Sequence, residues 1–175
     1  MKVFYLQKVD KITIISPSKI YIKNLGESLK ALKNWDKDSF TRVNKCLKFI
    51  FISPNNKKYN HTLVDDKAWI SGYDIFEGDY DMPYIASLLI HESHHVAQYL
   101  SGHEYFGEKA ETAAYKEQRK FLKKIKYDYA VQWLDKQYSN KWWKAMDKSV
   151  KGKTVADKLF SDFTGGKLAI KKLTV

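Results

Sequence analysis

The sequence predicts a single α+β domain of 175 residues, a length that suits one hydrophobic core and is too short for two. Three observations lead to this fold class. Short segments in the N-terminal half alternate apolar and polar residues, which is typical of half-buried strands. An apolar segment at residues 83–100 has the three- and four-residue spacing of a buried helix. Beyond residue 108 the apolar spacing remains helical, so we expect strands first and helices afterwards.

The first quarter of the chain is expected to contain strands and then a helix. Three segments are predicted to be strands: Val3–Leu6, Lys11–Ile15 and Lys19–Lys23. From Gly26 to about Leu47 the spacing becomes helical. Asp36 or Asp38 is the candidate cap inside this stretch, because a side-chain oxygen can accept a free backbone N–H at a helix start.

The next segments complete the expected sheet. Lys48–Ser53 is the strongest strand signal in the chain and is followed by turn residues. Residues 57–64 are expected to be a loop or a hairpin arm, and Ala68–Phe76 a further strand. Residues 1–82 would thus form a mixed sheet with a backing helix.

The helix expected after this sheet carries the most informative motif. Pro83 suits its first turn, and Gly102 lies just past its last apolar residue. His91 and His95 are four residues apart, so their imidazoles lie on one helical face and can bind one Zn²⁺. Glu92 lies one step around the helix, where it can accept a proton from a zinc-activated water.

A third zinc ligand is expected on the next helix. Glu108 and Glu111 are the candidates, three residues apart on one face. Glu111 is favoured because Ala110, Ala113 and Ala114 leave room for another helix to approach closely. Glu108 follows a glycine at the helix start, where capping or solvation is the ordinary role of a glutamate. Three protein ligands leave one position for water, as catalytic zinc sites do.

These motifs resemble those of the glutamate zincins, metallopeptidases that bind zinc through two His and one Glu. The patterns are H-E-x-x-H-x-x-Q and A-E-x-x-A-Y-x-x-Q, matched by His91, Glu92, His95, Gln98, Ala110, Glu111, Ala114, Tyr115 and Gln118. The resemblance covers about residues 65–122 and is closest to small zincin-like domains of bacteria and phages. Metzincins are excluded, since they need Gly and His where this chain has Gln98 and Ser101.

The resemblance implies a zincin-like fold and a zinc metalloprotease that acts on a peptide or protein substrate. The zinc ligands would be His91, His95 and Glu111. Glu92 would be the general base. In that architecture the last strand before the metal helix is an edge strand, which can pair with an extended peptide.

The oxyanion that develops during hydrolysis needs a hydrogen-bond donor in addition to zinc. Tyr115 is the candidate, because it lies one turn after Glu111 on the same face. Tyr105 in the preceding loop is the alternative. Ordinary packing is the competing interpretation for both tyrosines.

The remaining histidines and the single cysteine are given ordinary roles. His94 lies off the metal face and is expected to be exposed. His103 is expected in a loop, from which it could orient a ligand, and His61 has no visible partner. Cys46 is interpreted as a small buried thiol.

Beyond Gly107 the helix is expected to continue to about Gln137, which completes a metal-site region at residues 83–137. Residues 138–175 are expected to form a basic, mostly helical extension. Its predicted pieces are helices at Asn140–Val150 and Val155–Phe163 and a short strand or tail at Lys167–Val175.

The net charge of +11 is concentrated near the C-terminal end. Residues 116–175 hold 16 Lys or Arg against 6 Asp or Glu, while residues 1–115 are nearly neutral. Lysine-rich surfaces bind nucleic acid or another polyanion without sequence preference. An alternative function is therefore a zincin-fold structural or binding protein of a virion or secretion particle, with residues 116–175 contacting the polyanion.

The N-terminal segment does not predict export, because Gln7, Lys8 and Asp10 interrupt its apolar residues. No apolar run approaches the roughly 18 residues of a membrane-spanning helix. A cytoplasmic or virion-associated protein without a membrane partner is expected.

Overall fold

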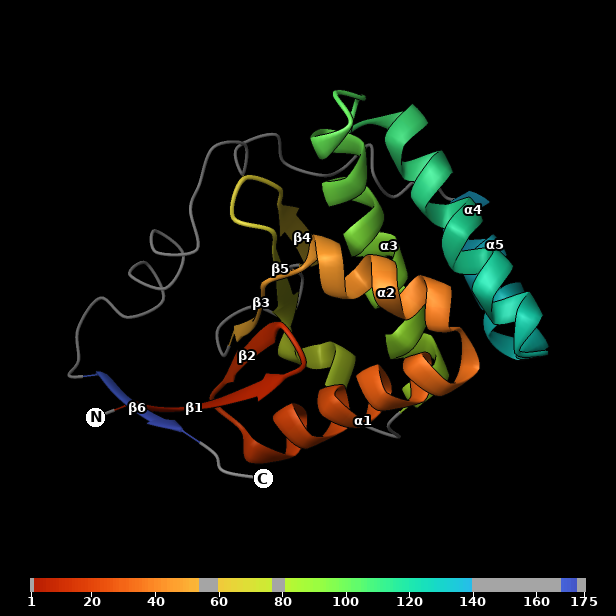
Figure 1. Ribbon diagram of the computed structural model, residues 1–175. Coiled ribbons are helices and arrows are strands. Elements are labelled where there is room, and N and C mark those ends of the chain that lie inside the picture. Colours follow the sequence, from red (N-terminus) through yellow and green to blue (C-terminus); the bar gives the residue numbers. More distant parts are fainter. Residues whose placement is uncertain (1, 54–59, 77–80, 140–167, 173–175) are drawn as a thin grey trace.

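The computed structural model describes residues 2–53, 60–76, 81–139 and 168–172. These residues form a mixed α/β structure in which helices cover one face of a sheet (Figure 1). The strands are β1 (Lys2–Val9), β2 (Ile12–Ser16), β3 (Phe49–Ser53), β4 (Asn60–Leu63), β5 (Ala68–Gly72) and β6 (Leu168–Lys172). The helices are α1 (Lys19–Trp35), α2 (Lys37–Cys46), α3 (Met82–Leu100), α4 (Glu108–Lys124) and α5 (Asp128–Ser139).

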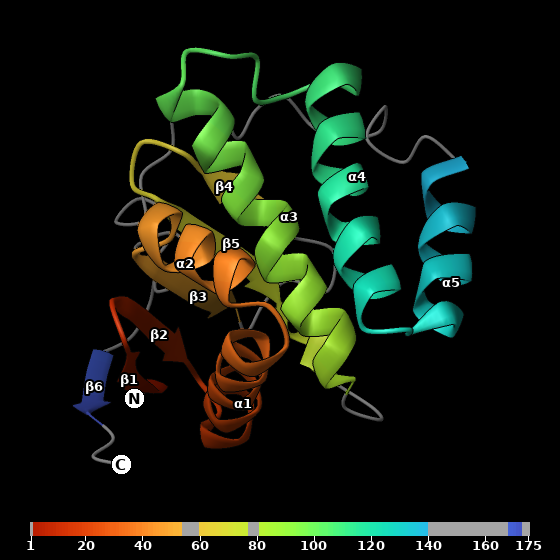
Figure 2. The same cartoon turned by 45° about the vertical axis from the view of Figure 1, so that its right-hand side comes forward.

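The six strands are arranged in the order β4-β5-β3-β2-β1-β6. The central strands β5, β3 and β2 are parallel to one another, whereas β4 runs antiparallel to β5 and β1 antiparallel to β2. β6 pairs in parallel with β1 at the far edge. Helices α1, α2 and α3 lie against the sheet, and α4 and α5 lie beyond α3 (Figure 2). α3 is therefore enclosed between the sheet layer and α4.

The N-terminal predictions are confirmed for β1 and β2 and wrong for the third segment. Residues 19–23 are the beginning of α1, not a strand. Ile22 is buried in line with Leu25, Leu29 and Leu32, so the helical spacing starts one turn earlier than expected. Ile20, which suggested alternation with Ile22, is 65% exposed.

The helical stretch that follows is divided at Asp36, as expected. The Asp36 carboxylate accepts hydrogen bonds from the Ser39 backbone N–H at 3.3 Å and the Ser39 hydroxyl at 2.9 Å, and so caps α2. Lys124 of α4 contacts the same carboxylate at 3.0 Å. Of the two candidate caps, the structure selects Asp36, and Asp38 lies exposed in the first turn of α2.

The later strands follow the expected order with one correction. The predicted strand at residues 48–53 is β3, and the hairpin arm is β4. The strand predicted at 68–76 ends at Gly72, and Tyr73–Phe76 form a 3₁₀ turn. The last strand before α3, β5, is not an edge strand, because β4 pairs with its outer side. The edge position near α3 belongs to β4.

The long helix expected from residue 108 to about residue 137 is interrupted. α4 ends at Lys124, and the N–H of Lys126 bonds to the Lys123 carbonyl while the N–H of Tyr127 bonds to the Leu122 carbonyl. This pair of hydrogen bonds is a Schellman motif, and Lys126 adopts its left-handed conformation with φ of 57°. The usual glycine is missing, so the sequence carries no signal for the break.

The predicted terminal strand or tail is a strand, β6. The helices predicted at 140–150 and 155–163 lie outside the described residues.

The main core lies between the sheet and the three covering helices. β-strand residues Ile14, Ile50 and Trp69 meet the apolar faces of the helices, and each is fully buried. Cys46 is buried in the same cluster, as expected. Each buried side chain of this size contributes roughly 1.5–3 kcal/mol to the free energy of folding, so α3 is held on a rigid base. Among the described helices, none has both the length and the apolar character that a membrane crossing requires.

Candidate metal centre

α3, which carries the H-E-x-x-H motif, begins and ends at the residues that its sequence suggests. Its cap is Asp81, whose carboxylate accepts the Tyr84 N–H at 3.0 Å, and Pro83 occupies the first turn. The Tyr127 hydroxyl donates a hydrogen bond to the other Asp81 oxygen at 2.9 Å. Gly102, just after the helix, has a φ of 72°, which glycine adopts at little cost. The motif therefore lies in the middle of a helix fixed at both ends.

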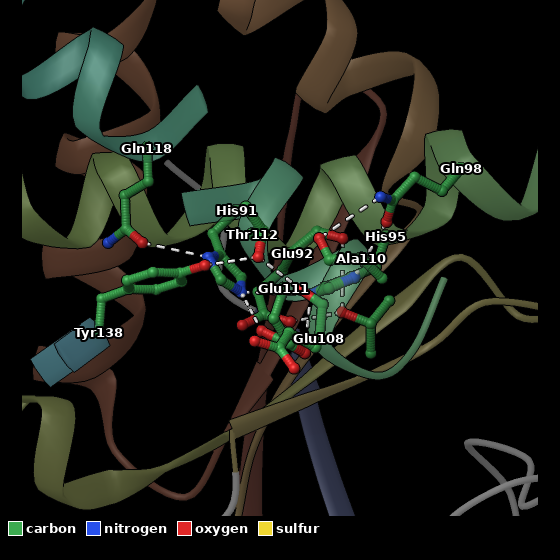
Figure 3. Close-up of polar contacts among 11 residues, drawn as sticks. His91, Glu92, His95, Gln98, Glu108, Ala110, Glu111, Thr112, Gln118 and Tyr138 are labelled. Atoms are coloured by element: carbon green, nitrogen blue, oxygen red, sulfur yellow. Dashed lines mark hydrogen bonds and ion pairs between the residues drawn. The ribbon is translucent and has the colours of Figure 1, made fainter. Parts of the chain in front are cut away.

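The two histidines of α3 and one glutamate of α4 converge on a single point (Figure 3). The Nε2 atoms of His91 and His95 lie 3.2 Å apart. The Nε2 atom of His91 is 3.3 Å from one Glu111 oxygen, and that of His95 is 3.5 Å from the other. All three side chains are buried. Two imidazole nitrogens and a carboxylate thus surround one position in the protein interior.

This geometry suits one transition-metal ion. Ligand atoms bound tetrahedrally to zinc at about 2.0–2.1 Å lie about 3.3–3.4 Å from one another, close to the 3.2–3.5 Å separations here. Ca²⁺ and Mg²⁺ prefer oxygen ligands, so two imidazoles argue against them. The Oε2 atom of Glu111 is buried, and its contact with the Nε2 atom of His91 at 3.3 Å does not have hydrogen-bond geometry, so it accepts no hydrogen bond from the described residues. A bound cation would stabilise this oxygen.

The charges at this point depend on the contacts between the imidazoles and Glu111. Burial by itself would raise the pKa of the Glu111 carboxyl, but its contacts with His91 and His95 outweigh burial and lower the pKa to about 2. Burial by itself would lower the pKa of the His95 imidazole, but contact with Glu111 outweighs burial and raises this pKa. The carboxylate is therefore ionised and available as a ligand at any ordinary pH.

Of the two candidates for a third ligand, Glu111 is the one that α4 brings to the histidines. Glu111 is 5% exposed and faces α3, where Ala110 and Ala114 are also buried. Glu108 is exposed at the start of the helix and lies outside the converging group. The small side chains around Glu111 allow the close approach of α3 and α4 that the sequence led us to expect.

Glu92 is buried beside the group but does not belong to it. Its side chain is 3% exposed. The Thr62 hydroxyl of the edge strand β4 donates a hydrogen bond to the Glu92 carboxylate at 2.5 Å. The sequence does not single out Thr62, because a threonine in a hairpin arm carries no sign of a distant carboxylate partner. The structure thus places a second carboxylate next to the edge of the sheet.

Two glutamines support the histidines from outside the group, and Figure 3 shows them approaching from opposite sides. Gln118 contacts the Nδ1 atom of His91 at 3.1 Å, and Gln98 contacts that of His95 at 3.2 Å. Both glutamines belong to the matched motifs, but the sequence assigns them no role. Their spacing is the available signal: Gln98 lies three residues after His95, and Gln118 two helical turns after Glu111.

The two tyrosines considered as oxyanion donors have other partners. The Tyr115 hydroxyl donates to Asp135 of α5, and its ring stacks on Tyr138 at 4.0 Å between centroids. Burial and Asp135 raise the pKa of Tyr115 to about 12. Tyr105 packs against the rings of Tyr99 and Phe106. The structure therefore engages Tyr115 in the α4–α5 contact, and the oxyanion donor stays unassigned.

His94 and His103 are not members of the group. His94 is half-buried, so the expected exposure is wrong. Burial, and then the nearby Arg42 guanidinium, lower its pKa to about 4. His103 is exposed in the loop after α3, as expected of a loop residue. His61 lies in β4, and its side chain is outside the described part of the structure.

Comparisons of the chain with protein-family models, curated proteins and solved structures give no match. What the structure shows is a buried His91–His95–Glu111 group that could bind a metal ion. The function must therefore be inferred from the residues of this group and their surroundings.

Proposed function

We propose that this protein is a zinc metallopeptidase, with His91, His95 and Glu111 as zinc ligands and Glu92 as general base. The convergence of two imidazoles and one carboxylate within 3.5 Å is the observation that carries the proposal. A structural zinc site would have four protein ligands, whereas the described residues offer three. The additional buried carboxylate of Glu92 is the group that hydrolysis requires and simple metal storage does not.

Each group at the site would have a separate role in hydrolysis. Zinc would supply Lewis acidity toward the substrate carbonyl and lower the pKa of water. Glu92 would hold the proton of the attacking water on its carboxylate and deliver it to the leaving amine. Thr62 would keep this carboxylate in place through its hydroxyl, which is already hydrogen-bonded to it.

An extended peptide is the substrate that the surroundings of Glu92 favour. β4 pairs with β5 on one side only among the described strands, and its Thr62 contacts Glu92. A peptide that added to the free edge of β4 would lie next to the general base. An antiparallel edge strand beside an H-E-x-x-H helix also supports the resemblance to the zincins, although the edge strand is β4 rather than the strand directly before α3.

The experiment starts with the metal content of the purified protein, measured by native mass spectrometry. One zinc per chain is expected. Glu92→Gln should retain the zinc and lose hydrolysis of an unstructured protein such as casein, while Glu108→Gln, at an exposed glutamate, should change neither. Absence of a bound transition metal would refute the proposal, and iron in place of zinc would redirect it to the oxidative chemistry of His₂-carboxylate sites.

The third ligand can be tested in the same assay. Glu111→Ala should remove the zinc or weaken its binding severely, because one of three ligands is lost. Glu108→Ala should leave the metal in place. Zinc retained by Glu111→Ala and lost by Glu108→Ala would reverse the assignment.

We propose polyanion binding as a second function, supported by the outward face of α4. Lys109, Lys116, Lys120 and Lys123 are exposed and lie on one helical face, which we call the lysine row. None of them forms an ion pair with another described residue. The buried face of α4 lies on the opposite side. From Lys109 to Lys123 the lysine row extends about 21 Å along the helix, at 1.5 Å per residue. Lysines without arginine favour phosphate contacts that do not depend on base sequence.

A further inference from the structure

Two glutamines form hydrogen bonds between the two helices that carry the candidate metal ligands. Gln118 belongs to α4, as Glu111 does, and contacts His91 and Ser87 of α3. Gln98 belongs to α3 and contacts the Ala110 carbonyl of α4 as well as His95. Each amide therefore joins one imidazole to the opposite helix. The chemistry of these contacts determines which imidazole nitrogen carries a hydrogen.

For His91 the assignment follows from a chain of donors and acceptors. The Ser87 hydroxyl donates its only hydrogen to the Tyr84 backbone carbonyl at 2.6 Å, because a carbonyl can only accept. The Ser87 oxygen is then an acceptor for the Gln118 NH₂ group at 3.0 Å. This fixes the Gln118 carbonyl toward His91, so the Nδ1 atom of His91 must be the donor.

For His95 a shorter series of hydrogen bonds also places the hydrogen on Nδ1. The Ala110 backbone carbonyl can only accept, so the Gln98 NH₂ group faces it, at 3.4 Å. The Gln98 carbonyl is then left to face His95, and the Nδ1 atom of His95 donates to it at 3.2 Å. In both neutral imidazoles the hydrogen is on Nδ1, and the lone pair is on Nε2.

We propose that Gln118 and Gln98 are positioning residues that hold both imidazoles in the Nδ1–H tautomer and preassemble the metal centre before a metal arrives. The proposal rests on the metal centre proposed above. A neutral imidazole has two tautomers, and the other one would direct an N–H toward the metal position. Because each glutamine also forms a hydrogen bond between α3 and α4, the pair helps to fix the distance between the histidines and Glu111.

The two glutamines are expected to contribute unequally. Gln118 is 2% exposed and Ser87 fully buried, and the distances along their chain are 3.1, 3.0 and 2.6 Å. Gln98 is only half-buried, and its bond to α4 is long at 3.4 Å. Water can replace a half-buried partner more readily than a buried one, so His91 should depend on its glutamine more than His95 does.

The test measures zinc affinity by competition with a chromogenic chelator in Gln118→Met, Gln98→Met and Gln132→Met. Methionine keeps the length of glutamine and removes its hydrogen-bonding groups. Gln118→Met should weaken zinc binding about 10–100-fold, the range seen when partners of ligating histidines are removed. Gln98→Met should weaken it less, and Gln132→Met, at an exposed site on α5, should leave it unchanged. Ser87→Ala removes only the group that orients Gln118, and it replaces Gln118→Met if that variant does not fold.

Nitrogen NMR of the imidazole rings in the metal-free protein supplies the second measurement, at alkaline pH. His91 and His95 should both show the Nδ1–H tautomer, and His91 should lose this preference in Gln118→Met. Unchanged zinc affinity together with an unchanged tautomer in that variant would overturn the proposal. If the parent protein binds no zinc, the proposed function fails, while the tautomer measurement still decides the role of the glutamines.

Discussion

The side chains around His94 form a contact between three helices that is separate from the candidate metal centre. Arg42 of α2 and Glu117 of α4 form an ion pair at 2.7 Å beside this histidine of α3. The Nδ1 atom of His94 is buried and has no hydrogen-bond partner among the described residues. Adding a proton here would place a second cation next to Arg42. His91 and His95 on the same helix oppose a charge on His94, while Glu117 favours it.

This contact should make the protein sensitive to mild acid. The pKa of His94 is lowered to about 4 from its ordinary value of 6.5, so as the pH falls between these values the unfolded chain binds a proton that the folded chain resists. The contribution of His94 to stability is complete above pH 6.5 and is lost toward pH 4. In the metal-free protein, the free energy of unfolding of His94→Gln should therefore rise relative to that of the parent as the pH falls through this range. The expected rise is about 1–2 kcal/mol after allowance for solvent screening.

Chemical denaturation at a series of pH values measures this difference. Every other titratable group is present in both proteins, so its contribution cancels in the comparison. A stability difference that stays constant with pH would show that His94 is protonated as easily in the folded as in the unfolded chain.

Among the connections between helices and strands, the turn between α4 and α5 should limit the stability of the protein. Lys126 adopts the left-handed conformation at φ of 57°, which costs a residue with a side chain roughly 1–2 kcal/mol and costs glycine little. Lys126→Gly should thus raise the free energy of unfolding, by up to about 1 kcal/mol once the added freedom of the unfolded chain is counted. Lys123→Gly, three residues earlier inside α4, should lower it by about 1 kcal/mol. Equal effects of the two substitutions in urea denaturation would contradict the role of Lys126.

The same turn shows why some elements can be predicted from the sequence and others cannot. α3 is predictable because its cap, its proline and its apolar spacing agree with one another. The end of α4 is hidden because lysine occupies a position at which glycine is the usual signal. The start of α1 is hidden because isoleucines at 20 and 22 fit a strand locally, and only packing of Ile22 against the sheet decides for the helix.

The site is predictable to the extent that its residues share helical spacing. His91, His95 and Glu111 follow from positions on two helices. Thr62 cannot be found in this way, because its contact with Glu92 depends on where the edge of the sheet meets α3. The orientation of Tyr115 toward Asp135 likewise depends on the break between α4 and α5, which the sequence conceals.

For the molecule as a whole, the distribution of charge can be tested by reversal. Changing Lys116, Lys120 and Lys123 to Glu should reduce retention on heparin and weaken binding to DNA, because the lysine row could no longer neutralise phosphates. The dependence of binding on salt should become shallower, by about 0.9 in log–log slope for each phosphate of duplex DNA that is no longer neutralised. Fluorescence anisotropy at several salt concentrations gives the affinity for DNA and its dependence on salt.

The matched control changes Lys8, Lys30 and Lys45 to Glu. These lysines are exposed on other elements, and the change in net charge is the same. If both triple variants lose affinity equally, total charge rather than the lysine row is responsible for binding.

The position of the candidate metal ligands along the chain has a consequence for the order of folding. His91, His95 and Glu111 lie on two consecutive helices, α3 and α4, which pack closely against each other. The pairing of β1 with β6, in contrast, joins Lys2 to Leu168 at the two ends of the sequence. Contacts between near neighbours close short loops and form early, while contacts between distant segments form late. Zinc present during refolding should therefore bind the helical hairpin before the sheet is complete, and accelerate folding rather than only slow unfolding.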